Sequence, residues 1–269
     1  MKNLKISESK VSIIMPFFNE GSRLDRAIEG VVNQSYTFWE LLLIDDGSTD
    51  NSLLIAKEWA ENDLRVKVYV SEINRGQVFA INWGLELASS NIVAFCDADD
   101  VWLSHKLLKQ LECMEQGIVN VVCGRSQYCN WATGYKSNPT PIYGKIKYND
   151  LLGGNRVGFS TLLINRLGLE VPTFHALNDG LIHHDFVFLL QFFQRNKNLL
   201  VIELPEVVCM IGLREGLSSN KWRAIQSQWW ILRQVAGLPM VHSIWKMVLY
   251  TKFVLQKRGL RTIWHMLNI

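Results

Sequence analysis

Between Val11 and Asn120, short apolar runs alternate with stretches whose apolar positions recur at helical spacing. The apolar runs, each long enough for one buried strand, lie at 11–16, 40–45, 66–70, 91–96 and 119–123. Helical spacing is found at 23–33, 51–61, 76–89 and 104–116. Because strands that alternate with helices form parallel sheets covered on both faces, the pattern predicts a doubly wound α/β fold. Such sheets bind ligands at the carboxyl ends of their strands.

The alternation stops after residue 124. The segment 125–150 is rich in Asn, Gly, Pro and Tyr and predicts loops or a hairpin. Further along, we expect strands at 157–164 and 198–203, a loop at 172–183 and a helix at 185–195. Two or three helices are expected beyond Asn220, with a break near Gly237 and Pro239. The organisation predicted is one domain over residues 1–219 and a helical appendage over 220–269.

Cysteine usage and the amino-terminal residues bear on the compartment. The five cysteines form no C-x-x-C pair, and their odd number argues against a secreted disulfide framework. Residues 1–10 contain no apolar signal core, so we expect no export. The apolar stretches near 186–193 and 240–255 are too short, or too interrupted by Lys246 and Lys252, to cross a bilayer. These features predict a cytoplasmic protein.

Charge is distributed unevenly along the chain. The first 215 residues carry 20 basic and 25 acidic side chains, whereas the residues after Glu215 carry eight basic ones and no acidic one. Five of the ten tryptophans also lie in 220–269. Interleaved Trp and basic residues suit an anionic membrane surface, which we therefore expect this segment to contact. Packing on the domain is the alternative, because the apolar residues around 241–255 spread over more than one helical side. The segment has no nucleic-acid motif, so nucleic acid is not an expected partner.

The sharpest polar cluster is CDADD, Cys96 to Asp100, directly after an apolar run. Three carboxylates within four positions repel one another, and a bound divalent cation usually relieves such repulsion. Oxygen ligands in an open loop favour Mg²⁺ or Mn²⁺, with phosphate oxygens completing the coordination shell. The alternative is a solvated loop in which Asp99 or Asp100 caps the helix that begins near Ser104.

Two further clusters follow other predicted strands. In LLLIDDGSTDNS (41–52), helix capping explains the far end of the motif but not Asp45 and Asp46, which could accept a hydrogen bond from a nucleobase imide. In INRGQ (73–77), Arg75 could pair with the aspartates, reach a phosphate or base, or simply be a surface residue in a turn.

Together with the opening VSIIMPFFNE (11–20), these clusters resemble the inverting glycosyltransferase family two, whose members adopt the GT-A fold. The family typically begins with V-S-I-I-x-P-x-x-N-E and continues with D-D-G-S-T-D, N-x-G and D-x-D-D, in the order and spacing found here over about residues 10–105. The resemblance implies a nucleotide-binding half at 10–124 and an acceptor half at 125–219. More loosely, residues 145–166 and the appendage look like the corresponding parts of bacterial enzymes that extend lipid-linked polysaccharide or lipopolysaccharide. This looser similarity implies a UDP-hexose donor and a lipid-linked saccharide acceptor. It also implies a location at the inner face of the cell membrane.

The resemblance also implies roles for individual residues. Pro16, Phe17 and Asn19 would line the nucleotide pocket, Asp46 would bind the base, and Arg75 would flank the base or the diphosphate. Asp97 would contact ribose or metal, and Asp99 would ligate the metal. Asp100 would either support these two residues or cap the following helix. Arg214, in a loop that resembles the family's flexible segment (211–222), would close over the diphosphate.

An inverting displacement also needs a general base on the acceptor side. In the family this base is the Asp of an E-D pair that opens a helix, and the matching residue here is Asp185 in HHDFVFLLQFF (183–193). His184 stands where the family usually has Glu, and His183 and His184 could orient Asp185 or mark an altered acceptor pocket. The simpler interpretation makes Asp185 a helix cap, and Asp179 is the second candidate for the base.

Two other functions compete with glycosyl transfer. A nucleotidyltransferase would use a similar sheet but would open with a Gly-rich phosphate loop, where this chain has PFFNE. The second is a scaffold protein that binds a sugar nucleotide without catalysis. It stays open because His184 stands where the family usually has Glu, next to the candidate base.

Overall fold

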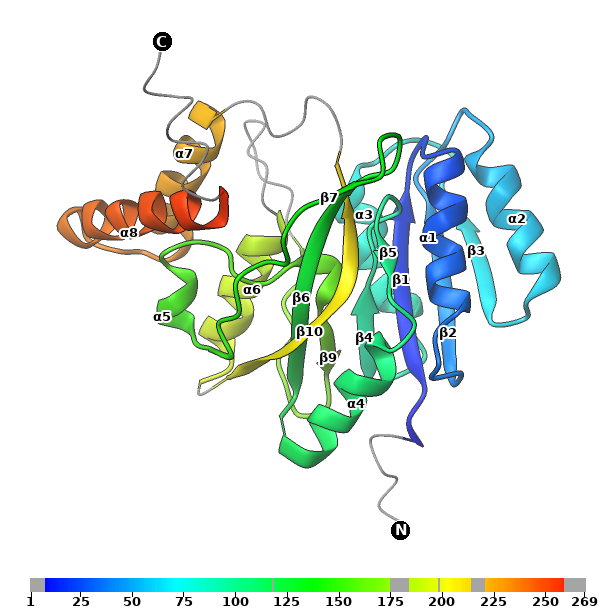
Figure 1. Ribbon diagram of the computed structural model, residues 1–269, viewed down its shortest axis with the longest axis horizontal. Coiled ribbons are helices and arrows are strands. Elements are labelled where there is room, and N and C mark those ends of the chain that lie inside the picture. Colours follow the sequence, from blue (N-terminus) through cyan, green and yellow to red (C-terminus); the bar gives the residue numbers. More distant parts are fainter. Residues whose placement is uncertain (1–7, 118, 175–183, 198, 214–220, 259–269) are drawn as a thin grey trace.

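The computed structural model describes residues 8–117, 119–174, 184–197, 199–213 and 221–258. These residues form one central sheet flanked by helices, with a helical appendage on one side (Figure 1). The strands are β1 Val11–Phe17, β2 Trp39–Asp45, β3 Val66–Val70, β4 Ile92–Phe95, β5 Val101–Trp102, β6 Val121–Asn130, β7 Tyr135–Lys136, β8 Lys145–Ile146, β9 Leu163–Asn165 and β10 Val201–Gly212. The helices are α1 Ser22–Val32, α2 Ser52–Asn62, α3 Gln77–Leu87, α4 Lys106–Gly117, α5 Tyr148–Leu151, α6 His184–Arg195, α7 Lys221–Trp230 and α8 Met240–Arg258.

The sheet is mixed but mostly parallel in its first half, as the alternating pattern predicted. Its strand order is β3-β2-β1-β4-β9-β6-β10-β5. The pairs β1–β2, β1–β4, β2–β3 and β6–β10 are parallel, whereas β9 runs antiparallel to both β4 and β6. The carboxyl ends of β1, β2 and β4 therefore meet at one edge, where the polar clusters follow.

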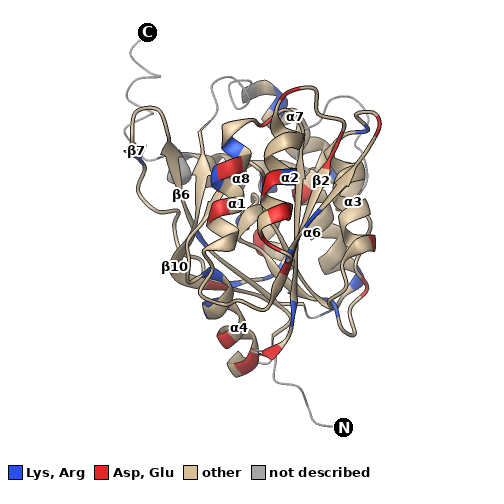
Figure 2. Ribbon diagram, turned by 90° about the vertical axis from the view of Figure 1, so that its right-hand side faces the viewer, with Lys and Arg blue, Asp and Glu red and all other residues tan. Residues whose placement is uncertain are grey.

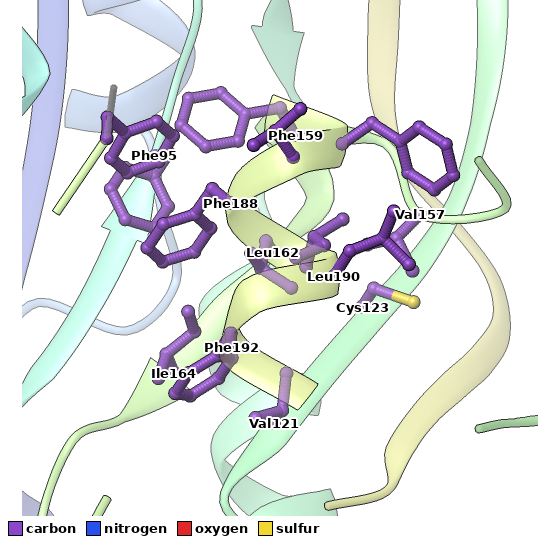
Figure 3. Packing of buried hydrophobic residues seen from close by; sticks show 14 of the residues in the cluster. Phe95, Val121, Cys123, Val157, Phe159, Leu162, Ile164, Phe188, Leu190 and Phe192 are labelled. Atoms are coloured by element: carbon purple, nitrogen blue, oxygen red, sulfur yellow. The ribbon is translucent and has the colours of Figure 1, made fainter. Parts of the chain in front are cut away.

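Two hydrophobic cores hold the helices on opposite faces of the sheet. Successive residues of β1 alternate between them, with Ile13 in the core beneath α1 and α4 and Ile14 in the core beneath α3 and α6. In the second core, aromatic side chains from β4, α6 and the segment before β9 pack together (Figure 3). The Phe95 and Phe159 rings stack at 4.5 Å, which ties the end of β4 to the later half of the chain.

Two expectations about the later half need correction. The strand expected at 157–164 is wrong for most of its length, because a 3-10 turn at Phe159–Thr161 comes first and β9 covers only Leu163–Asn165. This run is apolar because it is buried, and burial alone does not distinguish a strand from a turn. The strand expected at 198–203 begins at Val201 and continues to Gly212, with irregular pairing around Pro205 and Glu206. Within 125–150, β6 and β7 form the expected hairpin, and the short helix α5 begins before its end.

The appendage is helical as expected. Helix α7 continues into a π-helical turn at Ile231–Val235, Gly237 adopts a left-handed φ of 64°, and α8 begins at Met240 directly after Pro239. Figure 2 shows acidic residues on α1, α2 and α4, while the sequences of α7 and α8 contain none. Within the described ranges, no helix has both the length and the apolarity needed to cross a membrane.

Candidate functional site

A cleft of about 540 Å³ opens at the carboxyl edge of the sheet. Its walls come from the ends of β1, β4, β6 and β10 and from the segments that follow β2 and β3. The lining residues are Pro16, Phe17, Phe18, Glu20, Asp46, Asn74, Gly76, Gln77, Ala80, Asp97, Ala98, Asp99, Tyr128, Gly212 and Leu213. Each of the three polar clusters singled out in the sequence therefore contributes to one cavity.

The acidic loop, residues 97–100, is fixed by contacts from distant parts of the chain. The backbone N–H of Asp97 donates to Ser160 Oγ at 3.0 Å. The buried Asp100 carboxylate accepts the Gly212 N–H at 3.1 Å and also a hydrogen bond from Ser160. Position 212 requires glycine, because a Cβ atom there would lie 2.6 Å from the Asp99 carbonyl oxygen. Ser160 and the end of β10 thus hold the loop while Asp97 and Asp99 line the cleft.

The acidic loop carries an excess of negative charge. Burial, followed by the nearby charges of Asp97 and Asp99, raises the pKa of Asp100 well above its ordinary value, against the lowering effect of hydrogen bonds from Ser160 and Gly212. A divalent cation near Asp97 and Asp99 would relieve this repulsion. Among the described residues, no three His, Cys, Asp or Glu side chains gather into a group that could hold a metal. Carboxylate oxygens such as those of Asp97 and Asp99 are the kind of ligand that Mg²⁺ and Mn²⁺ prefer, with phosphate and water at the other positions.

Asp46 links the second and third clusters. Its two carboxylate oxygens accept the backbone N–H groups of Arg75 and Gly76 at 2.8 and 2.7 Å, and its side chain is almost fully buried. The next residue, Gln77, donates through Nε2 to Asp97 Oδ1 at 3.2 Å. A chain of hydrogen bonds therefore connects Asp46 to the acidic loop through the start of α3. Sequence reasoning missed Gln77, whose only signal was its position directly after the N-x-G element.

Asn19 supports the site without being among the residues that line the cleft. It adopts a left-handed φ of 54°, and its Oδ1 accepts the Thr49 N–H at 2.8 Å while its own N–H donates to Ser48 Oγ at 3.1 Å. Asp45 Oδ1 accepts the Ser48 N–H at 3.0 Å from the other side. These contacts fix the turn after β2. The predicted contact of Asn19 with nucleotide stays a prediction.

Arg75 also lies outside the cleft lining. Its side chain is exposed, and the guanidinium carbon lies 4.3 Å from the centroid of the Phe79 ring on α3. Pro16 and Phe17, by contrast, lie in the wall as expected for residues at the end of β1. The backbone of Arg75 is part of the site through Asp46, whereas the role of its side chain stays a prediction.

Asp185 occupies the first turn of α6, where it is half-buried. Its Oδ2 accepts a hydrogen bond from Asn155 Nδ2 at 3.1 Å, which fixes the orientation of the carboxylate. Asp185 is not among the residues that line the 540 Å³ cleft. Arg214, Asp179 and His183 lie outside the described residues, so their predicted roles rest on the sequence.

Comparison with known proteins decides the family. A family model described as "Glycosyl transferase family 2" matches residues 12–176, which is more than half of the chain. The chain belongs to glycosyl transferase family 2. This finding confirms the resemblance seen in the sequence and supports glycosyl transfer over the nucleotidyltransferase alternative.

Curated relatives match along nearly their whole length. An uncharacterized glycosyltransferase of Haemophilus influenzae is 33% identical over 89% of this chain and 94% of its own. The putative teichuronic acid biosynthesis glycosyltransferase TuaG of Bacillus subtilis is 29% identical, with 92% and 97% covered. The Escherichia coli enzyme WfgD, named a UDP-Glc:alpha-D-GlcNAc-diphosphoundecaprenol beta-1,3-glucosyltransferase, is 29% identical, with 86% and 88% covered.

Solved structures confirm the GT-A fold. Residues 1–349 of TarS from S. aureus, in complex with UDP-GlcNAc, superpose with a TM-score of 0.65 at 18% identity, covering 92% of this family 2 chain and 72% of that one. The mannosyltransferase PcManGT from Pyrobaculum calidifontis, in complex with GDP-Man and Mn²⁺, gives a TM-score of 0.57 at 18% identity, covering 91% and 74%.

Proposed function

We propose that this family 2 glycosyltransferase transfers a hexose from a UDP-sugar, with inversion and metal assistance, to a hydroxyl of a lipid-linked saccharide in cell-surface polysaccharide synthesis. One observation carries the proposal: Asp46 and, some fifty positions later, Asp97 and Asp99 line a single cleft at the carboxyl edge of the sheet. A nucleoside diphosphate needs such a combination of base-binding and metal-binding groups. The UDP-GlcNAc bound by the structurally similar TarS supports the choice of nucleotide.

The residues that line the cleft suggest how the nucleotide-sugar donor would bind. Pro16 and Phe17 offer apolar surface to the nucleoside, while Asp46 holds the 75–76 turn and presents its remaining lone pairs to the base. Asp97 and Asp99 would hold Mn²⁺ or Mg²⁺, which when bound neutralises charge on the diphosphate leaving group. Ser160 and Gly212 keep these two carboxylates in place by fixing the acidic loop. Arg214 is proposed to add a cation as its segment closes over the diphosphate.

Inversion defines the chemistry on the acceptor side. The acceptor oxygen forms a bond to the sugar C1 as the bond from C1 to the diphosphate oxygen breaks on the opposite face, and the hydroxyl proton passes to Asp185. The hydrogen bond from Asn155 holds the Oδ2 atom of this carboxylate, and Oδ1 would receive the proton. The nucleoside diphosphate leaves with the electron pair of the broken bond.

The acceptor and the location rest on the relatives and on charge. WfgD is named for a GlcNAc-diphosphoundecaprenol acceptor, and TuaG for teichuronic acid biosynthesis. The basic, Trp-rich segment 220–269 suits contact with the anionic inner face of the cell membrane, where such acceptors are exposed to a cytoplasmic enzyme.

UDP release across a panel of UDP-sugars, with a lipid-linked acceptor and Mn²⁺, tests the proposal. We expect Asp185→Asn to lower kcat by about a hundredfold or more while leaving UDP affinity unchanged. Asp25→Asn is the matched control, since Asp25 also lies in the first turn of a helix but on the outer surface of α1.

Calorimetry of UDP binding separates the alternatives. Wild-type protein should bind UDP more tightly with Mn²⁺ than without, and Asp99→Asn should abolish the difference. Tight binding without turnover on any donor would favour a sugar-nucleotide-binding scaffold. Failure to bind UDP with Mn²⁺ present would refute the proposed donor site.

A further inference from the structure

Helix α8 has apolar residues on two opposite sides, and its inner side packs on the domain. Met247 contacts the core beneath α6, Phe253 is buried against Gly154, and its ring lies 6.3 Å from that of Tyr143. Lys246 Nζ donates to the carbonyl oxygen of Asn149 at 3.1 Å. These contacts fix the rotation of α8 about its axis, so the direction of its other side is settled.

The other side presents large apolar residues to solvent. We call Val241, Ile244, Trp245 and Val248 the outer face; their exposed fractions are 77%, 53%, 61% and 55%. The spacing of three and four residues puts all four side chains on one stripe of the helix. Figure 1 shows α8 at the margin of the molecule, away from the central sheet. A helix that is apolar on both sides is normally covered on both sides, so the outer face calls for a partner.

Charge identifies the kind of partner. Lys252 is exposed and lies four residues after Val248, on the same stripe. Neither α7 nor α8 contains an acidic residue, and the sequence after Glu215 has eight basic residues. Two copies of this chain joined through their outer faces would bring these positive charges together without an acidic counterpart. A bilayer with anionic lipids offers hydrocarbon to the valines and isoleucine, an interface to Trp245 and phosphates to Lys252.

We propose that α8 docks on an anionic lipid bilayer through its outer face, lying parallel to the membrane plane at the level of the headgroups. The purpose of this docking rests on the proposed function: it would bring the cleft to an acceptor embedded in the membrane. In Figure 1, α7 and α8 lie in the upper half of the view, the half toward which β1 runs. The cleft lies at that end of β1, where Pro16 and Phe17 line it. The inner side of α8 stays packed on the domain, so docking requires no rearrangement of the helix.

Flotation of the full chain with lipid vesicles tests the docking. Vesicles of phosphatidylcholine alone and of phosphatidylcholine with phosphatidylglycerol are compared, in reducing buffer without nucleotide. We expect binding to the anionic vesicles, weakened about tenfold or more by Val241→Glu with Val248→Glu. Lys252→Gln should weaken binding about threefold to tenfold, with less dependence on salt.

Leu54→Glu with Leu64→Glu is the matched control, because both leucines are at least 60% exposed and lie on or just after α2. This variant gains the same charge and loses similar apolar surface, and it should bind vesicles as the wild type does. Circular dichroism confirms that each variant is folded, as expected for substitutions at exposed positions.

Three results would overturn the docking. These are absence of binding to anionic vesicles, equal loss in the α8 and control variants, or a dimer of the wild-type protein in solution that the α8 substitutions dissociate. Because the vesicles contain neither donor nor acceptor, these results do not depend on glycosyl transfer. UDP release with a water-soluble acceptor tests the catalytic proposal separately.

Discussion

At the scale of single residues, the candidate site depends on buried polar side chains that join segments distant in sequence. Ser160 is 2% exposed, accepts the Asp97 N–H and hydrogen-bonds the Asp100 carboxylate. It comes from a turn rather than from the acidic loop itself. Positioning residues of this kind act on the reaction through the groups that they hold.

Replacing Ser160 with Ala is predicted to weaken donor binding. The Asp97 N–H and the Asp100 carboxylate each lose a partner, and a loss of about 1–3 kcal/mol corresponds to a fall of roughly fivefold to 150-fold in kcat/KM. Calorimetry should show weaker UDP binding with Mn²⁺, and Ser160→Thr, which keeps the hydroxyl, should restore it. The control is Ser227→Ala, because the buried Ser227 hydroxyl has no hydrogen-bond partner within the described residues. Equal losses in the two variants would mean that Ser160 has no special role in positioning.

Lys106 is a buried cation that makes the stability of the fold depend on pH. Its side chain is fully buried, its Nζ donates to Gln110 Oε1 at 2.7 Å, and it lies 3.8 Å from the centroid of the Trp102 ring. Burial lowers its pKa to about 7, although the nearby thiols of Cys209, Cys96 and Cys123 act in the opposite direction. Since the folded chain holds its proton less tightly than the unfolded chain, folding is opposed most strongly below pH 7.

The stability of the wild type should therefore rise relative to that of Lys106→Met as pH increases from about 7 toward 10.5. Across this window we expect a relative gain of roughly 2–4 kcal/mol, measured by urea unfolding in reducing buffer. Lys109→Met, which alters an exposed lysine on the same helix, should show no such change. A constant difference between the wild type and Lys106→Met at all pH values would mean that Lys106 keeps an ordinary pKa.

At the scale of elements, the sequence predicted the first half of the sheet well and the second half poorly. The runs at 11–16 and 40–45 match β1 and β2, which are buried along all seven residues and therefore have an unambiguous apolar pattern. The two-residue strand β5 was missed and the long strand β10 was cut short, because the pairing of both strands depends on tertiary contacts rather than on periodicity.

The residues of the candidate site likewise fall into two groups, those that a local sequence pattern predicted and those that it did not. Asp46, Asp97 and Asp99 were found because carboxylates directly after a buried strand form a local pattern. Ser160 and Gln77 act through tertiary contacts, and nothing in their neighbouring residues predicts those contacts. Asn19 was found by the family motif, and its observed hydrogen bonds to the 48–50 turn give it a supporting place beside the cleft.

At the opposite edge of the sheet, a buried carboxylate joins β1, β2, β3 and the segment after α3. Glu40 is 1% exposed and accepts hydrogen bonds from Lys67 at 2.8 Å, Lys10 at 3.0 Å, Ser12 at 2.7 Å and Ser89 at 2.6 Å. Burial alone would raise the pKa of Glu40, but these hydrogen bonds outweigh it and hold the pKa far below its ordinary value.

Replacing Glu40 with Gln is predicted to destabilise the fold by about 2–4 kcal/mol at neutral pH, because two lysines lose their shared anion. The stabilisation from Glu40 is complete above the unfolded-state pKa of about 4.5 and is lost as pH falls below it. The difference between the two proteins in chemical unfolding should therefore shrink in acid. Glu58→Gln, at an exposed position on α2, serves as the control and should leave stability within about 0.5 kcal/mol of the wild type.

At the scale of the whole molecule, positive charge and exposed apolar surface coincide on α8, while the acidic residues lie on the domain. An enzyme held at the membrane meets a lipid-linked acceptor at a high local concentration. A water-soluble acceptor gains nothing from attachment. Substitutions in the outer face should therefore lower the rate of transfer only when the acceptor is embedded in a bilayer.

The Val241→Glu, Val248→Glu variant is accordingly predicted to lose about tenfold or more in kcat/KM for an acceptor embedded in anionic vesicles. On a water-soluble saccharide acceptor it should match the wild type, since neither substituted residue lines the cleft. The Leu54→Glu, Leu64→Glu control should match the wild type on both acceptors. An equal loss on both acceptors would show that the outer face acts through the fold of the domain, because a defect confined to membrane attachment cannot slow transfer in solution.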